Sequence, residues 1–164
     1  MSQRKTSFAP IVQDDTQLLI LGSLPGEKSL SAGQYYAHPQ NRFWHLMERV
    51  IGAPLVSLPY DERTGALLRH KVGLWDAVKS AERSGSLDAS IRKVEATDLC
   101  DLVSHLPKLR AVAFNGKKSE AIGRPQLAQS GARCVTLPSS SPAHAAMTFD
   151  EKAREWDKLQ HFLR

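Results

Sequence analysis

The sequence predicts an α/β fold, a three-layer α/β/α sandwich with a central four-stranded parallel sheet. Four short apolar runs without polar alternation are typical of strands that are buried on both faces. Segments with helical spacing of apolar residues separate these runs, and such alternation builds a parallel sheet covered on both sides. The chain has 164 residues, 41% of them hydrophobic, which suffices for one domain with a sizeable core. We expect residues 1–15 to form an N-terminal arm and residues 16–164 to form this single domain.

The predicted strands follow the apolar runs, and the predicted helices lie between them. The strands occupy residues 17–22 (QLLILG), 72–78 (VGLWDAV), 110–114 (RAVAF) and 133–137 (RCVTL). The helices occupy residues 41–52, 61–70, 97–105, a segment from Lys117 onward, and residues 150–163. Gly52 is expected to end the first of these helices, and Thr97 is expected to cap the third.

Charge and cysteine content narrow the classes of partner. The formal net charge of +5 favours a polyanionic partner through its long-range field. The two cysteines cannot supply an iron–sulfur cluster or a zinc site that needs four thiolates, and no Cys/His cluster has metal-ligand spacing. The N-terminus has no apolar signal core, and no apolar run is long enough to span a bilayer. We expect a cytoplasmic monomer with no cofactor, no metal and no membrane contact.

Small, polar, aromatic and basic residues follow all four predicted strands. A long loop, residues 22–41 (GSLPGEKSLSAGQYYAHPQN), follows the first, and loops of this length are usually functional. Asp76 comes after the second, Lys117 after the third, and residues 137–145 (LPSSSPAHA) after the fourth. Ligands of such sheets bind beyond the carboxyl ends of the strands. These residues suit a pocket for a flat polar ring beside a phosphate backbone.

Several familiar chemistries are absent from the sequence. It contains no GxxxxGK[ST] phosphate loop, no GxGxxG and no HExxH. The serine of GSLPG is second rather than third, so this segment is not a GxSxG nucleophile elbow. No lysine stands out as a buried amine for Schiff-base chemistry, and strand cleavage by lyase action is therefore not expected.

Five segments together resemble a known family. GSLPG, QYYAHPQNRFW, GLWDAV, AFNG and LPSSSPAHA are similar to segments of hypoxanthine-DNA glycosylases, a branch of the uracil-DNA glycosylase superfamily. The resemblance runs from about Leu18 to His144. It implies a uracil-DNA glycosylase-like fold and a monofunctional base excision repair enzyme. Such an enzyme flips a deaminated base (hypoxanthine, with uracil as a second candidate) out of DNA and hydrolyses its N-glycosidic bond, leaving an abasic site.

The resemblance also implies residue roles. The essential carboxamide of the hypoxanthine branch, an Asn after the His-Pro pair, corresponds to Asn41. Better-known branches carry a catalytic Asp or Asn where this chain has Leu24, which can neither orient water nor stabilise charge. The position that reads the base in relatives corresponds to Asp76. The last motif, which grips DNA near the flipped nucleotide, corresponds to residues 139–142. Many relatives have a His at the start of this motif, where this chain has Leu137, and His144 comes later.

We therefore expect Asn41 to be catalytic. A neutral Asn can orient water through its carbonyl oxygen and donate through its amide, but it is not a strong general base, so the leaving base must be stabilised. Aromatic side chains can stack on a flipped base. The residues expected to bind the base are Gly22, Ser23, Leu24, Tyr36, Phe43 and Asp76. The residues expected to bind DNA are Ser139, Ser140, Ser141, Pro142, His144 and Lys117.

Structural roles and other functions stay open at this point. Asn41 lies where a predicted helix begins and is a favoured N-cap residue, and Asp76 suits a cap as well. Phe43 or its neighbour belongs to the core, and Lys117 suits a solvated face. A non-catalytic module that binds DNA or nucleotides on the same fold is the alternative function, and an enzyme acting on free nucleosides is a third.

Overall fold

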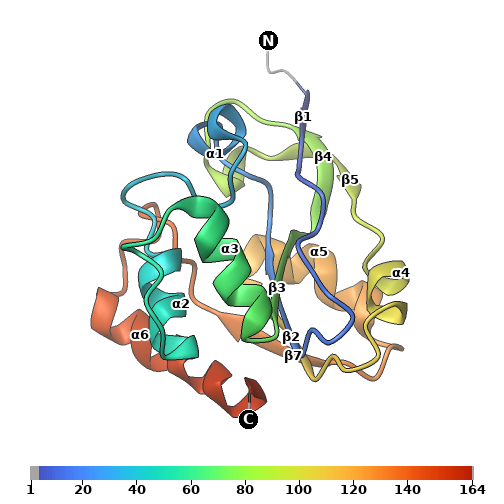
Figure 1. Cartoon of the computed structure of the whole chain (residues 1–164). Helices are drawn as coiled ribbons and strands as arrows, with labels where there is room; N and C mark the ends of the chain where they lie inside the picture. Colours follow the sequence, from blue (N-terminus) through green and yellow to red (C-terminus); the bar gives the residue numbers. More distant parts are fainter. Residues whose placement is uncertain (1–3, 164) are drawn as a thin grey trace.

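The structure, a computed structural model, describes residues 4–163. Strands and helices alternate along most of the chain (Figure 1). In chain order the elements are β1 (Arg4–Thr6), β2 (Leu18–Gly22), α1 (Glu27–Ala32), α2 (Phe43–Ile51), α3 (Tyr60–Arg69), β3 (Val72–Asp76), β4 (Val78–Glu82), η1 (Asp88–Ser90), β5 (Arg92–Ala96), α4 (Leu99–Ser104), β6 (Ala111–Asn115), α5 (Lys117–Leu127), β7 (Arg133–Leu137), α6 (Phe149–Asp157) and η2 (Lys158–Leu163).

The central sheet has four parallel strands in the order β3-β2-β6-β7. This confirms the predicted fold class. Strand β2 lies inside the sheet, with Leu18 opposite Val72 of β3 on one side and opposite Ala111 of β6 on the other. All five residues of β2 are buried, which explains why its sequence is apolar without alternation.

Helices cover both faces of this sheet, so that the core has two halves. Ile20 points to the half formed with helices α2, α3 and α6, whereas its neighbours Leu19 and Leu21 point to the half formed with α4 and α5. In Figure 1, helices α2, α3 and α6 lie on one side of the strands, and helices α4 and α5 lie on the other. Successive strand residues point to opposite faces, so each half takes every second residue of the strand. The result is a three-layer sandwich.

A second sheet, antiparallel and three-stranded, was not predicted. Its strand order is β1-β4-β5, and it lies beside the carboxyl end of β3. The prediction of one strand over residues 72–78 was wrong at its end, because the chain leaves the central sheet after Asp76 and Val78 already begins β4. Buried Val78 prolongs the apolar run across this break. The first strand of the new sheet lies within residues 1–15, and the division of the chain at residue 15 remains a prediction.

Helix bounds differ from the predicted ones by one or two residues, and two of the helices differ in a further respect. Thr97 does not cap α4: Asp98 does, accepting a hydrogen bond from the Asp101 backbone N–H at 3.1 Å, while the Thr97 hydroxyl donates to the carbonyl of Asp76. The predicted C-terminal helix divides into α6 and the 3₁₀ helix η2. Gly52, in contrast, ends α2 in the left-handed conformation, as predicted.

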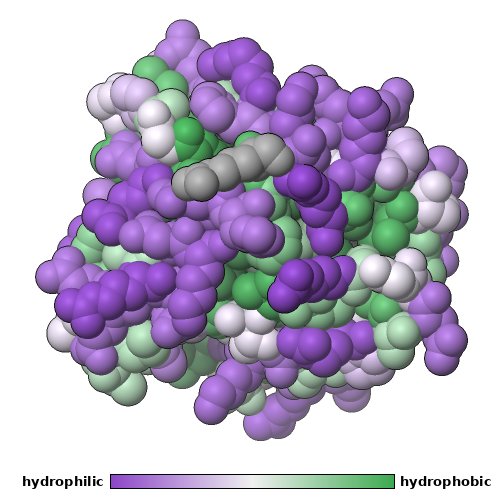
Figure 2. Space-filling model, turned by 90° about the horizontal axis from the view of Figure 1, so that it is seen from below, coloured by the Kyte–Doolittle hydropathy of each residue, from purple (hydrophilic) through white to green (hydrophobic). Residues whose placement is uncertain are grey.

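The surface is mainly hydrophilic (Figure 2), as expected when most apolar side chains are buried in the core. Hydrophilic residues cover most of the face seen in Figure 2, and hydrophobic residues are visible between them in separate patches. Among the described residues, no helix has the length and apolar character needed to cross a membrane.

Candidate functional site

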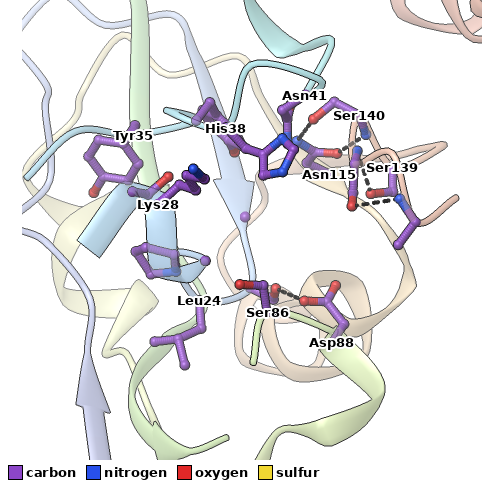
Figure 3. Close-up of a pocket in the computed structure, with 18 of the residues that line it drawn as sticks. Leu24, Lys28, Tyr35, His38, Asn41, Ser86, Asp88, Asn115, Ser139 and Ser140 are labelled. Carbon is purple, nitrogen blue, oxygen red and sulfur yellow. Dashed lines mark hydrogen bonds between the residues drawn. The ribbon is translucent and has the colours of Figure 1, made fainter. Parts of the chain in front are cut away.

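A pocket of about 230 Å³ lies where the strands of the central sheet end. At about 30 Å³ per water molecule, this is the volume of roughly seven or eight waters. Figure 3 shows Asn41, Asn115, Ser139 and Ser140 on one side of the pocket and Ser86 and Asp88 on the opposite side. The lining comes from the ends of β2, β3 and β6, from the loops after β2 and β7, and from residues 86–88 between β4 and β5.

Two buried polar groups of the pocket have no hydrogen-bond partner. Asp76, at the end of β3, is only 3% exposed, and its Oδ2 atom is unpartnered. The Tyr36 hydroxyl is also buried and unpartnered. Unpaired polar groups are costly in a protein interior, and each calls for an explanation. A bound ligand that forms hydrogen bonds with both groups would be a direct explanation.

Gly22 brings these two groups together. A Cβ atom at this position would lie 2.6 Å from Oδ1 of Asp76 and 3.0 Å from the hydroxyl of Tyr36. Contacts this short are too close for carbon, so any larger residue would displace the carboxyl group or the ring. The glycine at the end of β2 is therefore required for the present shape of the pocket.

Burial changes the charge state of the pocket. Loss of hydration and the nearby carboxylate of Asp88 raise the pKa of Asp76 to about 7, while the Arg83 guanidinium acts in the opposite direction. Near neutral pH Asp76 is thus divided between a carboxylate, which only accepts hydrogen bonds, and a carboxylic acid, which also donates one. Burial and the charge of Asp76 also raise the pKa of Tyr36, so its hydroxyl remains protonated and can donate.

Tyr36 is held in an unusual backbone conformation. Its φ angle is 55°, which non-glycine residues rarely adopt. Its ring stacks on that of Phe43 with 3.8 Å between centroids, and its carbonyl accepts a hydrogen bond from Nε1 of Trp44 at 3.2 Å. Strained residues of this kind are found preferentially in functional sites. Phe43 itself is fully buried behind Tyr36 and does not line the pocket, so the expectation that Phe43 contacts the base is corrected.

Asn41 lines the pocket and lies just before Arg42, the N-cap residue of α2. The Oδ1 atom of Asn41 accepts a hydrogen bond from the backbone N–H of Phe43 at 2.9 Å. A carbonyl oxygen has two lone pairs, so this bond leaves one acceptor site for a water molecule. No acceptor among residues 4–163 takes a hydrogen bond from the Asn41 amide nitrogen. The side chain can therefore keep its bond to the Phe43 N–H and take part in chemistry at the same time.

Asn115 is a pocket residue that sequence reasoning did not select. It exchanges two hydrogen bonds with Ser140: its Nδ2 donates to the serine hydroxyl, and its Oδ1 accepts from the serine backbone N–H, both at 2.9 Å. The next residue, Gly116, has φ 99° and packs against Ser139. Asn115 thereby joins the end of β6 to the serine loop. Its place directly after the third predicted strand was the signal that could have identified it.

The wall made by residues 86–88 depends on Arg83, which was not among the predicted site residues. Arg83 is 1% exposed and donates hydrogen bonds to the carbonyl groups of Leu24 and Pro25. The hydroxyl of Ser23 donates to Oδ1 of Asp88 at 2.6 Å. These bonds join the GSLPG segment to the second sheet. No sequence signal indicated them, because the second sheet itself was not predicted.

The expected DNA-binding residues are divided between two cavities. The four residues 139–142 line the pocket, whereas Lys117 and His144 line a neighbouring, more open depression of about 890 Å³. Buried Lys152 donates to the carbonyl of Ser141 at 3.3 Å, and burial lowers the pKa of this lysine. Gly22, Ser23, Leu24, Tyr36 and Asp76, expected to bind the base, all line the pocket with Asn41.

The site offers neutral amides, hydroxyls and the buried carboxyl group of Asp76, and its lining also includes the ionisable side chains of Glu27, Lys28, His38 and Asp88. Within residues 4–163, no group of three or more His, Cys, Asp or Glu side chains is arranged to hold a metal ion. The arrangement can orient a water molecule at Asn41 and form hydrogen bonds to a polar ring at Tyr36 and Asp76.

Comparisons with known proteins identify the family of the chain. The sequence model of the Uracil DNA glycosylase superfamily matches residues 9–163. A protein of Methanosarcina barkeri (strain Fusaro / DSM 804) named Hypoxanthine DNA glycosylase is 43% identical over 141 residues, which cover 86% of this chain and 89% of the relative. A protein of the same name from Methanosarcina acetivorans is 37% identical over 155 residues, or 94% of this chain and 97% of the relative.

A solved structure is similar as well. The solution NMR structure of a Methanosarcina acetivorans protein, provisionally assigned as a uracil DNA glycosylase, superimposes with a TM-score of 0.88 at 35% sequence identity. The match covers 99% of this chain and 100% of that one.

Proposed function

The chain belongs to the Uracil DNA glycosylase superfamily, and from this membership and the pocket we propose that it releases hypoxanthine from DNA. The protein is a monofunctional DNA glycosylase of DNA repair, as its relatives named Hypoxanthine DNA glycosylase indicate over most of their length. It hydrolyses the bond between base and deoxyribose after the nucleotide has left the duplex. Uracil is a second candidate base, because it carries the same pair of adjacent groups as hypoxanthine.

The observation that favours hypoxanthine over adenine is the pair of unpartnered groups in the pocket. Hypoxanthine presents the acceptor O6 next to the donor N1–H. The Tyr36 hydroxyl can donate to O6, and Oδ2 of Asp76 can accept from N1–H. Adenine presents a donor and an acceptor in the reverse order, so the ionised form of Asp76, which can only accept, disfavours it. A site that leaves its buried polar groups unpaired rejects the wrong ligand strongly.

Asn41 is proposed to act on the sugar side of the same bond. Breaking an N-glycosidic bond builds positive charge on the sugar and negative charge on the base. The free lone pair of the Asn41 carbonyl would hold a water molecule against the sugar, and hydrogen bonds to the leaving base would stabilise its charge. Because Asn is a weak base, most of the rate enhancement comes from the leaving group.

The DNA backbone is proposed to run along the serine loop. We propose that the polar groups of residues 139–141 contact phosphates, together with Lys117 and His144 at the adjacent depression. We propose that the protein acts as a monomer in the cytoplasm.

An assay of base release tests this function. Duplexes that carry a single hypoxanthine are incubated with the protein and then treated with alkali to reveal abasic sites. Asn41→Ala should lower release by about 10²–10³, and Gln40→Ala, an exposed neighbour, should not. Binding without release would favour a non-catalytic module, and activity on free nucleosides alone would favour the third reading. Unchanged turnover of Asn41→Ala would remove this residue from catalysis.

A further inference from the structure

Asp88 lies at the outer end of the pocket. It lines both the pocket and the neighbouring depression, so it stands where the two cavities meet. Asp76 and the Tyr36 hydroxyl are buried and mark the inner end, whereas Asp88 is partly exposed. Figure 3 shows Asp88 on the wall opposite Asn41. A base held at the inner end would therefore leave its deoxyribose at the outer end, between Asn41 and Asp88.

One oxygen of the Asp88 carboxylate is fixed by the protein, and the other has no partner. Oδ1 accepts a hydrogen bond from the Ser23 hydroxyl at 2.6 Å. Among the described residues, none donates to Oδ2 or forms an ion pair with Asp88. The other carboxylates of the lining have different surroundings: Glu27 pairs with Lys5 at 3.2 Å, and Asp76 lies at the inner end. Asp88 is thus the carboxylate available to a charged group at the outer end.

The backbone that carries this carboxylate is held by further hydrogen bonds. The Ser86 hydroxyl accepts from the backbone N–H of Glu27 at 2.9 Å. The carbonyl of Gly85 accepts from Nζ of Lys5 and from Nε of Arg83, each at 3.0 Å. A charge that is already in place does not have to reorganise during a reaction, and electrostatic stabilisation is largest under this condition.

The charge of Asp88 also acts across the pocket. Burial is the main cause of the raised pKa of Asp76 and of Tyr36, and the carboxylate of Asp88 adds to both shifts. Arg83, of opposite charge, donates to two backbone carbonyl groups instead of pairing with Asp88. A group between Asp88 and the inner end is therefore exposed to its negative potential.

The proposed reaction develops positive charge at this end of the pocket. The bond between C1′ of the deoxyribose and N9 of hypoxanthine breaks, and its electron pair leaves with the base. The sugar is then cationic until the oxygen of the water at Asn41 bonds to C1′, and one proton of this water ends on the released base. A carboxylate beside the sugar interacts more strongly with this cation than with the neutral substrate, so it lowers the barrier.

We propose that Asp88 is a catalytic residue that stabilises the positive charge of the sugar in the transition state. This inference rests on the proposed function. The carboxylate comes from η1, between β4 and β5, whereas Leu24, after β2, can supply no charge.

Asp88→Asn tests the proposal, because Asn keeps the shape of the side chain and an oxygen that can accept from Ser23. Hypoxanthine release in a single turnover is measured from pH 5 to pH 9, and the rate should rise as Asp76 ionises and becomes an acceptor for N1–H. If Asp88 acted only on the pKa of Asp76, its neutralisation would move this rise to lower pH and leave the rate above pH 8 unchanged. Loss of charge stabilisation should instead lower the rate above pH 8 by about 10²-fold.

Asp101→Asn is the matched control, since it removes an exposed carboxylate of α4 outside the pocket lining and should match the wild type. An undiminished rate of Asp88→Asn above pH 8 would overturn the proposal.

A binding experiment separates this proposal from the proposed function. Two duplexes are compared, one with a neutral tetrahydrofuran in place of the nucleotide and one with a pyrrolidine, whose protonated ring nitrogen resembles the cationic sugar. Anisotropy titrations of the wild type should show tighter binding of the pyrrolidine duplex by at least about tenfold, and Asp88→Asn should lose this preference. If the wild type releases no base, the proposed function fails, while this comparison still decides on Asp88. An equal preference in both proteins would refute its role.

Discussion

Asp76→Asn is expected to stabilise the protein at alkaline pH. Burial raises the pKa of Asp76 from 3.8 to about 7, so ionising this carboxyl costs the folded state about 4 kcal/mol. Below pH 3.8 the group is protonated in both folded and unfolded chains. Between pH 3.8 and about 7, the folded chain retains a proton that the unfolded chain has lost, so stability falls as the pH rises through this window. Above pH 7 the cost is complete.

Asn is close in shape to the protonated acid and never carries the charge. At pH 8 the free energy of unfolding of Asp76→Asn should therefore exceed that of the wild type by up to about 4 kcal/mol. For a chain of this size this corresponds to a Tm higher by on the order of 10 °C. The gain should fade towards pH 4. Urea unfolding across pH 4–9 measures it. Asp61→Asn, an exposed carboxylate in α3, is the control and should give a flat difference.

A constant difference between Asp76→Asn and the wild type from pH 4 to pH 9 would refute this reasoning, and so would a loss of stability at pH 8. Asp88→Asn supplies a second check. The Asp88 carboxylate contributes to the raised pKa of Asp76, so its neutralisation should shift the wild-type pH dependence to lower pH. If the profile does not move, the coupling between these two carboxyl groups is absent.

Three further variants test the construction of the pocket. Gly22→Ala should lower the free energy of unfolding in urea by about 1–3 kcal/mol and lower base release, because its methyl group would displace Asp76 or Tyr36. Wild-type stability together with wild-type base release would contradict this close approach. Tyr36→Phe removes an unpartnered hydroxyl, so Tm should hold or rise while hypoxanthine release falls at least about tenfold; full activity would exclude the hydroxyl from base recognition. Arg83→Met should lower the free energy of unfolding by about 2–4 kcal/mol, because it leaves buried carbonyl groups without a hydrogen-bond donor. An unchanged Tm would show that these carbonyl groups find other partners.

The central sheet was predictable because its strands are buried on both faces. Residues of β2 must be apolar at every position, and this leaves a continuous run that no surface strand would carry. The second sheet has the opposite character: all five residues of β5 (RKVEA) are exposed, so no apolar pattern marks them. Its strands are recognised by pairing with distant segments, such as Arg4 with Glu82, and pairing over this separation has no local signal.

The pocket was predictable to the extent that it follows from strand ends. Asn41, Asp76 and the serine loop come after predicted strands, and the structure places all of them in one lining. Phe43 was misplaced because an aromatic residue near a site can contact either the ligand or another ring, and here it supports Tyr36 from behind. The contribution of residues 86–88 could not be foreseen, since it depends on the unpredicted sheet.

The pocket's function is tested most directly by a crystal structure of the Asn41→Ala variant bound to a duplex that contains one hypoxanthine. We expect the base outside the stack and inside the pocket, with O6 within hydrogen-bond distance of the Tyr36 hydroxyl and N1 within hydrogen-bond distance of Asp76. A hypoxanthine still stacked in the duplex, or one that meets this pair of side chains with another edge, would contradict the account.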